Sequence, residues 1–138
     1  MTQRTLTIIK PDSVANRNVG KIVARLEAEG FTIVAGRMLH LSPDQAREFY
    51  AEHRGKGFYD SLVEYMTSGA VWVMALERSG AVAHLRAVMG DTNPDKAGDG
   101  TIRKLYGESI ERNSIHGSAN PADAARELQF FFPTAALL

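Results

Sequence analysis

Residues 4–10 read RTLTIIK and run directly into Pro11. β-Branched and aliphatic residues dominate this stretch, as in a short strand that is buried in a sheet. Proline has no amide hydrogen to donate to a neighbouring strand, so we expect the strand to stop there. Lys10 is thereby placed at the end of a strand.

The rest of the chain mixes further strands with helices. Strands are predicted at residues 31–41, 70–77 and, as a short piece, 115–118. Helices are predicted at residues 19–30, from 42, at 58–69, 80–90 and 101–107, and from 120. Ser42 with Gln45, and Asn120 with Pro121, are cap signals. Three or four short strands do not make a doubly wound sheet, so we expect an α+β fold with helices layered on a small antiparallel sheet.

The composition limits the function classes. Residues 1–138 have the length of one domain. The chain has 16 Lys and Arg against 16 Asp and Glu, so no global field attracts nucleic acid and any phosphate site is local. There is no cysteine, which excludes disulfides and thiolate chemistry. No apolar run approaches the roughly 18 residues of a membrane span. We therefore expect a soluble, cytoplasmic protein that binds no membrane and does not bind nucleic acid strongly.

Familiar metal and phosphate motifs are absent. Residues 91–102 begin like a calcium loop, but Lys96 stands where the turn glycine belongs and Ile102 where the bidentate glutamate belongs. The glycines around Lys56 lack P-loop spacing, and no G-x-G-x-x-G follows a strand. A phosphate site in this chain is therefore not formed by a glycine-rich loop.

His116 is the first candidate for chemistry, because histidine suits nucleophilic and acid/base roles. Gly117 leaves room for a substrate close to the backbone. Glu127 follows eleven residues later, and the last helix could bring it to one ring nitrogen and leave the other to attack. Taken alone, Glu127 is more simply a solvated surface residue. The other histidines, for which surface or packing roles are the default, are His40, His53 and His84.

Three cations form a second candidate group. Lys10 ends a strand, and Arg86 and Arg103 flank the loop at residues 90–100, which contains Thr92 and no apolar anchor. One guanidinium group can donate two parallel hydrogen bonds to phosphate oxygens, so basic groups at the ends of a loop indicate a phosphate site. For each cation alone, surface solubility is the simpler interpretation.

The third group comprises Tyr50, Phe58, Leu62 and Ile110. A flat nucleobase could be held between Phe58 and an aliphatic partner. Core packing is the alternative, and for Leu62 neither interpretation is favoured.

Together these residues resemble the nucleoside diphosphate kinase family over nearly the whole chain. The stretches that carry the resemblance are TLTIIKPDSV, YAEHRGKGFYDSLVEYMTSGAV, GDTNP, GTIRKLYG and RNSIHGSAN with the later AAREL. The resemblance implies a ferredoxin-like α+β fold, with a four-stranded antiparallel sheet covered by helices. It also implies an enzyme that moves the γ-phosphoryl group of a nucleoside triphosphate to a diphosphate, by a ping-pong route through a phosphohistidine.

The resemblance implies a role for each matching residue. His116 falls on the nucleophile, and Glu127 and Ser118 on the pair that orients its ring. The nucleotide contacts are Lys10, Tyr50 and Asn113 for the ribose and transferred phosphate, Arg86, Thr92 and Arg103 for the other phosphates, and Phe58 and Ile110 for the base. Leu62 is also expected among the nucleotide-binding residues. Mg²⁺ is the implied cofactor, held mainly by the nucleotide phosphates and water rather than by protein ligands. A base held by its faces implies tolerance of purines and pyrimidines, and of ribose and deoxyribose.

The chain departs from the family pattern at three places. Ala119 follows the motif serine where an acidic residue is common, and we expect activity to survive this. Gly57 and Asp99 stand where many relatives have proline, which loosens loops beside the nucleotide. The family implies a homo-oligomer, a tetramer or hexamer built from dimers, with Pro94 in a loop between subunits. The apolar residues 135–138 could be buried at such an interface.

Two other functions stay open at this level. One is a catalytically idle module that binds nucleotide or single-stranded nucleic acid through Phe58 and the arginines. The other is hydrolysis of a nucleoside triphosphate, in which water accepts the phosphoryl group.

Overall fold

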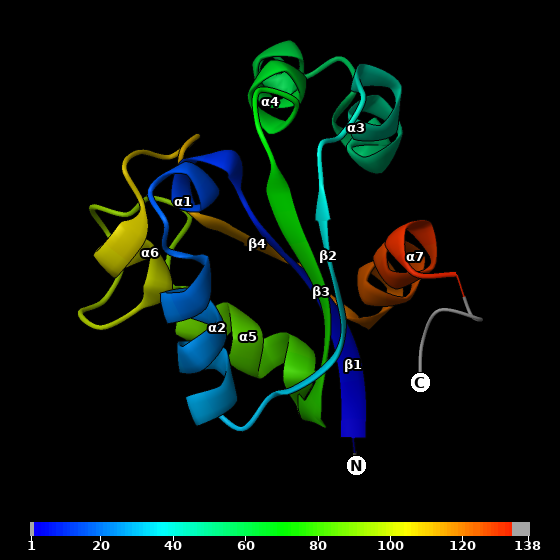
Figure 1. Ribbon diagram of the computed structural model, residues 1–138. Coiled ribbons are helices and arrows are strands. Elements are labelled where there is room, and N and C mark those ends of the chain that lie inside the picture. The colour runs from blue at the N-terminus through cyan, green and yellow to red at the C-terminus, as the bar shows by residue number, and fades with distance from the viewer. Residues whose placement is uncertain (1, 134–138) are drawn as a thin grey trace.

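The computed structural model describes residues 2–133, which form an antiparallel sheet with helices on both faces and at one end (Figure 1). The strands are β1 (Thr2–Ile9), β2 (Thr32–Leu39), β3 (Val71–Ser79) and β4 (Ile115–Gly117). The helices are α1 (Pro11–Ala15), α2 (Val19–Ala28), α3 (Pro43–Phe49), α4 (Tyr59–Met66), α5 (Ala81–Met89), α6 (Ile102–Tyr106) and α7 (Pro121–Phe131), with a 3-10 turn η1 (Ala51–His53). The strand order is β2-β3-β1-β4, and the fold is the expected ferredoxin-like α+β type.

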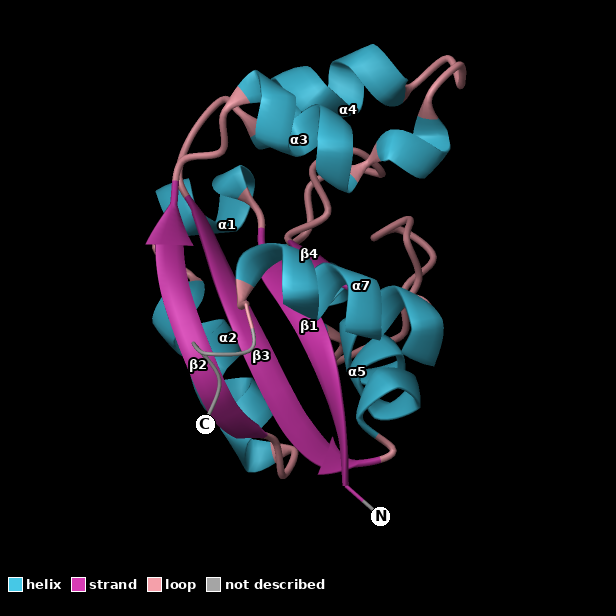
Figure 2. Cartoon of the chain, turned by 90° about the vertical axis from the view of Figure 1, so that its right-hand side faces the viewer, coloured by secondary structure: helices cyan, strands magenta, loops and turns pink. Residues whose placement is uncertain are grey.

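β1 lies inside the sheet and is buried on both faces. It pairs with β3 along its length and with β4 at its end, where Ile8 lies opposite His116. Successive side chains of a strand point to opposite faces. Leu6 and Ile8 therefore join a core beneath α7, and Ile9 joins a second core beneath α2 and α5. Figure 2 shows α7 across the first of these faces, with α3 and α4 beyond the end of the sheet.

Both predicted caps are present. Ser42 Oγ accepts the Gln45 amide at 3.1 Å, and Gln45 Oε1 accepts the Ser42 amide at 2.9 Å, so the predicted capping box of α3 is confirmed. Asn120 Oδ1 accepts the Asp123 amide at 2.8 Å and caps α7. α7 begins at a defined residue, which fixes the part of the helix that faces β4.

The elements that were not predicted are short. Pro11 ends β1 as expected, but it also begins α1, a five-residue helix that is too short to show a hydrophobic period. The 3-10 turn η1 has three residues and escapes the pattern for the same reason. No helix within residues 2–133 is long and apolar enough to cross a membrane. The proposed interface segment 135–138 lies outside the described residues.

Candidate active site

One pocket of about 680 Å³ lies beyond the end of β1, between the α3–α4 end of the molecule, α7 and the segment before β4. The predicted site residues that line it are Lys10, Tyr50, Phe58, Leu62, Arg86, Thr92, Arg103, Ile110, Asn113, His116 and Glu127. Ser118 is not in the lining; it lies behind Glu127 and bonds to it. The three candidate groups thus share one cavity, although their members are spread along the chain from Lys10 to Glu127.

The centre of the pocket is a histidine–carboxylate pair. His116 Nε2 lies 2.8 Å from Glu127 Oε1, and Ser118 Oγ donates to the same oxygen at 2.9 Å. Glu127 is only 3% exposed, so its interpretation as a solvated surface residue is wrong. With Nε2 bound to the carboxylate, Nδ1 is the ring nitrogen that remains for chemistry.

The carboxylate of Glu127 decides which ring nitrogen of His116 carries a proton. Burial by itself raises the pKa of the Glu127 carboxyl, but the hydrogen bonds from His116 and Ser118 and the charge of Arg126 outweigh it and hold the pKa below its usual value. The group is therefore a carboxylate and an acceptor at neutral pH. His116 must carry its proton at Nε2 to donate this bond, which leaves a lone pair on Nδ1.

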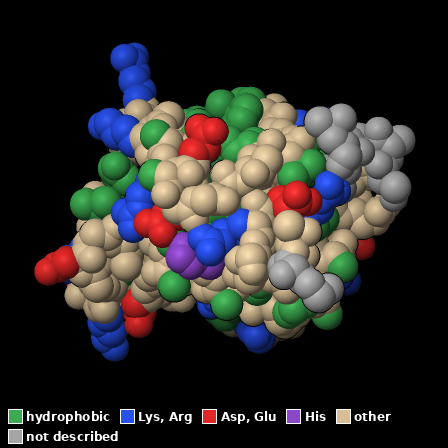
Figure 3. All heavy atoms as spheres, turned by 90° about the horizontal axis from the view of Figure 1, so that it is seen from below, with side chains coloured by type: hydrophobic (Ala, Val, Ile, Leu, Met, Phe, Trp, Pro, Cys, Tyr) green, Lys and Arg blue, Asp and Glu red, His purple; other side chains and the backbone are tan. Residues whose placement is uncertain are grey.

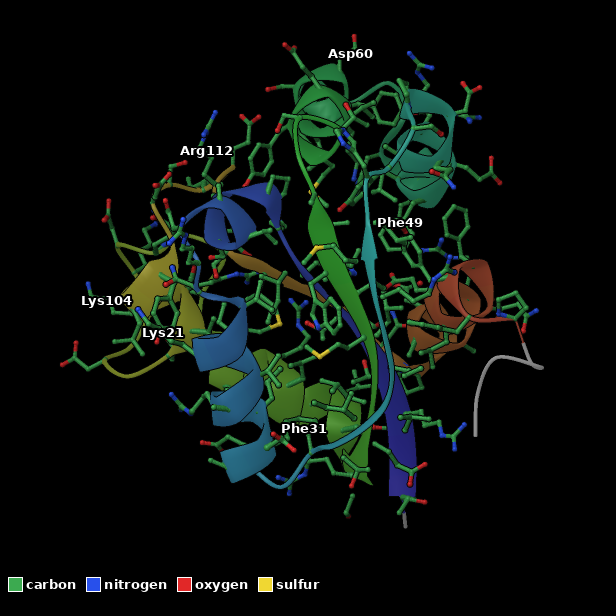
Figure 4. The ribbon with its side chains drawn as sticks, in the orientation of Figure 1. Lys21, Phe31, Phe49, Asp60, Lys104 and Arg112 are labelled. Carbon is green, nitrogen blue, oxygen red and sulfur yellow. The ribbon has the colours of Figure 1, made fainter. Side chains whose placement is uncertain are left out.

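The ring of His116 is also held by packing. Phe49 meets it edge-on at 5.5 Å between ring centroids, and Tyr50 does so at 6.5 Å. The backbone carbonyl of His116 accepts a 2.7 Å hydrogen bond from Thr7 Oγ1 on β1. Phe49, labelled in Figure 4, reaches from α3 into the space beside α7. Two aromatic rings therefore hold the imidazole ring of His116, and the hydrogen bond from β1 holds its backbone.

Lys10 is a buried cation, with 8% of its surface exposed. Its Nζ donates to Asn113 Oδ1 at 2.8 Å, and Asn113 Nδ2 donates to the Thr92 carbonyl at 3.0 Å. Burial and the nearby Arg103 guanidinium lower the pKa of Lys10 to about 8, against the opposing charges of Asp12 and Glu111. A bound anion would compensate this buried positive charge.

The two arginines stand beside β4. Arg103 donates to the carbonyls of Ile115 at 2.8 Å and Gly90 at 3.2 Å, and Arg86 donates to the Gly117 carbonyl at 3.3 Å. Burial and the charge of Arg86 lower the pKa of Arg103 to about 10, so it remains cationic at neutral pH. Within residues 2–133 no group accepts from Arg103 Nε. A buried cation with an unused donor is suited to hold a phosphate oxygen.

Tyr50 offers a second unused polar atom. Its hydroxyl is buried and has no partner in the described part of the chain. Burial and the charge of Glu127 raise the pKa of Tyr50, so the phenol stays protonated and can donate to a ligand.

The mouth of the pocket is apolar. Phe58 is 50% exposed and Ile110 is 60% exposed, which is unusual for large apolar side chains. Leu62 lies beside them, half-buried, and packs against the core as well as lining the pocket. Leu62 therefore belongs both to the core and to the pocket. Phe58 and Ile110 are placed to hold a flat ring between them.

Several lining residues were not predicted from the sequence. His53 has the packing role that was expected as one default, since it stacks on Tyr50 and its ring centroid lies 5.2 Å from that of Phe58, but it also lines the pocket. The remaining unpredicted charged residues of the lining are Glu52, Glu111 and Asp123. Only Asp123 carried a sequence signal, since it precedes Glu127 by one helical turn and shares its face of α7.

Gly117 lines the pocket, and it also has a packing role that was not expected. A Cβ at this position would lie 2.5 Å from Met89 Sδ and 2.9 Å from Leu85 Cδ2. The glycine is thus required so that α5 can pack against β4. Around Gly57 nothing lies within 4 Å, so no contact requires a glycine there. Asp99 is exposed, and Ala119 lines the pocket.

Comparisons with known proteins agree with this geometry. The family model described as nucleoside diphosphate kinase matches residues 3–137. A nucleoside diphosphate kinase of Sorangium cellulosum is 55% identical over 130 residues, which cover 94% of this chain and 90% of that protein. The Aquifex aeolicus nucleoside diphosphate kinase structure superposes with a TM-score of 0.97 at 36% identity, over all of both chains. A Halobacterium salinarum nucleoside diphosphate kinase in complex with CDP gives a TM-score of 0.96 at 38% identity, over 100% of this chain and 92% of that one. The chain belongs to the nucleoside diphosphate kinase family and is a phosphotransferase of nucleotides.

Proposed function

We propose that the chain transfers the γ-phosphoryl group of a nucleoside triphosphate to a nucleoside diphosphate in two half-reactions, with a phosphohistidine on His116 between them. The observation that supports this best is the Glu127 carboxylate at Nε2, with Ser118 beside it, in a pocket that also holds three cations. This arrangement leaves Nδ1 as the nucleophile.

In the first half-reaction, the lone pair on Nδ1 forms a bond to the γ-phosphorus while the bond to the β-phosphate oxygen breaks. The diphosphate leaves with those electrons. In the second, a terminal oxygen of another diphosphate attacks the same phosphorus, and the electrons of the N–P bond return to Nδ1. The Glu127 carboxylate stabilises the positive charge that the ring carries between the two steps.

The cations act on the phosphoryl oxygens. Phosphoryl transfer needs positioning and charge stabilisation more than covalent help from the protein. Lys10, Arg86 and Arg103 supply three positive charges in one cavity, and two of them are buried. In such surroundings each charge acts more strongly on phosphate than it would in water.

Mg²⁺ fits this pocket as a companion of the nucleotide. Within residues 2–133 no group of three or more His, Cys, Asp or Glu side chains could hold a metal ion. The carboxylates that line the cavity are Glu52, Glu111, Asp123 and Glu127. Phosphate oxygens and water would therefore supply most ligands of the ion, which would neutralise charge on the phosphates.

Broad base and sugar tolerance is part of the proposal. Phe58 and Ile110 would contact the faces of a base, which all bases share, and both side chains are half-exposed at the mouth. The CDP complex of the Halobacterium salinarum relative holds a pyrimidine nucleotide. A purine and a pyrimidine should therefore bind with similar affinities.

The decisive experiment separates this function from its alternatives. The protein is mixed with ATP and Mg²⁺, and its intact mass is measured at alkaline pH. One added phosphoryl group is expected, removed by ADP or by acid, and none in His116→Ala. Phosphate release without any diphosphate acceptor would indicate hydrolysis. Nucleotide binding without label or turnover would indicate the idle module.

We further propose that the enzyme works in the cytoplasm as a homo-oligomer, a tetramer or hexamer built from dimers. Met38 on β2 is 51% exposed and Leu105 on α6 is 56% exposed. Burial between subunits would remove both large apolar side chains from water.

A further inference from the structure

Ser114 has an uncommon backbone conformation next to the proposed nucleophile. Its φ is +78°, in the left-handed region that side-chain-bearing residues rarely adopt. The Ile115 amide donates to the Asn113 carbonyl at 2.9 Å, so Ser114 is the central residue of a γ-turn with positive φ, a rare and strained form. This turn lies between Asn113, which holds Lys10, and β4, which carries His116.

Residues at the start of α1 bind every polar atom of Ser114. Asp12 Oδ2 accepts its amide at 3.1 Å, and Ser13 Oγ donates to its hydroxyl oxygen at 2.6 Å. Its carbonyl accepts the Lys10 amide at 2.8 Å. Ser114 and Ser13 are fully buried. A strained turn persists only when its surroundings over-determine it, and these contacts do so.

Asp12 is itself anchored from the other side. Its Oδ1 accepts the hydroxyl of Tyr65 on α4, and its amide donates to the same hydroxyl oxygen at 3.1 Å. Asp12 is 6% exposed and Tyr65 is 5% exposed. Burial and the Asp12 hydrogen bond raise the pKa of Tyr65, so this hydroxyl remains a donor. One carboxylate thus joins α4 to the turn.

We propose that Asp12 is a positioning residue for phosphoryl transfer, acting through the Ser114 turn on Lys10, Asn113 and His116. This rests on the function proposed above. Asp12 is not among the residues that line the pocket, so it does not act on the nucleotide by contact. A displacement of about 1 Å in a reacting group can cost on the order of 100-fold in rate. The strained conformation of Ser114 is therefore kept because the turn sets the position at which β4 begins.

The test uses two substitutions and their combination. Asp12→Asn keeps the size of the side chain but offers one acceptor oxygen for two donors. The single-turnover rate of phosphohistidine formation at saturating ATP should fall by about tenfold or more. Ser114→Gly alone is the reference for the double variant, because glycine adopts positive φ without strain but lacks the hydroxyl that Ser13 binds. Asp12→Asn with Ser114→Gly should be several-fold faster than Asp12→Asn.

The melting temperature separates positioning from plain stability. Glycine at a φ of +78° relieves strain in the folded state, but it also loosens the unfolded chain and removes the hydroxyl that Ser13 binds, so the rates are compared well below the melting temperature of every variant. A role in stability alone predicts equal rates at that temperature, because all variants are then folded. Asp44→Asn, an exposed carboxylate paired with Arg47 on α3, is the matched control and should change neither. If Asp12→Asn does not fold, Tyr65→Phe replaces it in the test. Tyr65→Phe should form phosphohistidine several-fold more slowly than the wild type, and Ser114→Gly in that background should restore the rate.

Two outcomes would overturn this inference while the proposed function stands, provided that the wild type is labelled. One is that Asp12→Asn forms phosphohistidine as fast as the wild type. The other is that adding Ser114→Gly to Asp12→Asn does not raise its rate. Absence of label in the wild type would remove the proposed function and this inference with it.

Discussion

Oε1 of Glu127 receives two hydrogen bonds, from His116 Nε2 at 2.8 Å and from Ser118 Oγ at 2.9 Å. Glu127→Gln keeps an acceptor at this place but removes its charge. A charge-assisted bond contributes about 1.5–3 kcal/mol, so kcat should fall by roughly 10- to 150-fold. Steady-state kinetics measures this, with exposed Glu48→Gln on α3 as the unchanged control. Equal kcat in Glu127→Gln and wild type would show that the carboxylate charge plays no part in the reaction.

Lys10 predicts a specific pH dependence of nucleotide binding. Its pKa is about 8 in the folded protein, because of burial and the charge of Arg103. A bound phosphate prefers the protonated amine, so the Kd for ADP should rise above pH 8 by up to about tenfold per pH unit. Lys10→Arg should abolish this rise, because guanidinium stays charged. Calorimetric titration between pH 7 and 9.5 checks it, and a flat wild-type profile would contradict it.

The same pKa predicts the opposite trend for stability. In the unfolded chain the pKa of Lys10 has the ordinary lysine value of 10.5, above the folded value of about 8. Between these two values the unfolded state binds more protons, so the contribution of Lys10 to stability rises with pH across that window. Affinity for nucleotide and the Lys10 contribution to the free energy of unfolding therefore move in opposite directions. Comparing urea unfolding of wild type and Lys10→Met at pH 8 and 10 isolates that contribution.

Among the elements, β4 depends on a close approach of α5. A Cβ on Gly117 would lie 2.5 Å from Met89 Sδ. Gly117→Ala should therefore lower the free energy of unfolding by about 1–3 kcal/mol. Gly57→Ala is the matched substitution, since nothing lies within 4 Å of that site, and it should be neutral or stabilising by up to about 1 kcal/mol. Urea unfolding measures both, and equal effects would refute the packing role of Gly117.

The elements also show what the sequence could predict. β1 and the helix caps at Ser42 and Asn120 follow from local patterns, and the structure has them where expected. α1 was missed because five residues carry no period. The burial of Glu127 could not be predicted from its spacing to His116, since it depends on how α7 packs on the sheet. The contact between Lys10 and Asn113 joins positions 103 residues apart, which only the complete fold brings together.

Charge is mixed over the whole chain and over the face of the molecule seen in Figure 3. Lys and Arg side chains are interspersed with Asp and Glu on that face. The chain has 16 Lys and Arg against 16 Asp and Glu. A chain without net positive charge attracts polyanions weakly, so we do not expect strong binding of nucleic acid. Oligonucleotide binding that falls steeply with salt would contradict this expectation.

Assembly is the second prediction for the whole molecule. Met38 and Leu105 are large apolar side chains that are more than half exposed in one chain. Sedimentation equilibrium should give four or six times the chain mass of 15.1 kDa. Met38→Asp should shift the distribution to smaller species, because burying an unpaired charge at an interface is costly. A single 15.1 kDa species at micromolar concentration would contradict the proposal.

In the proposed reaction, Nδ1 of His116 carries the phosphoryl group between donor and acceptor. To test this, the protein is labelled with ATP and digested at alkaline pH, and mass spectrometry and ³¹P NMR identify the phosphorylated residue and ring nitrogen. We expect phosphorylation at Nδ1 of His116, removed by any nucleoside diphosphate. Label on Nε2, on another residue, or nowhere would contradict it.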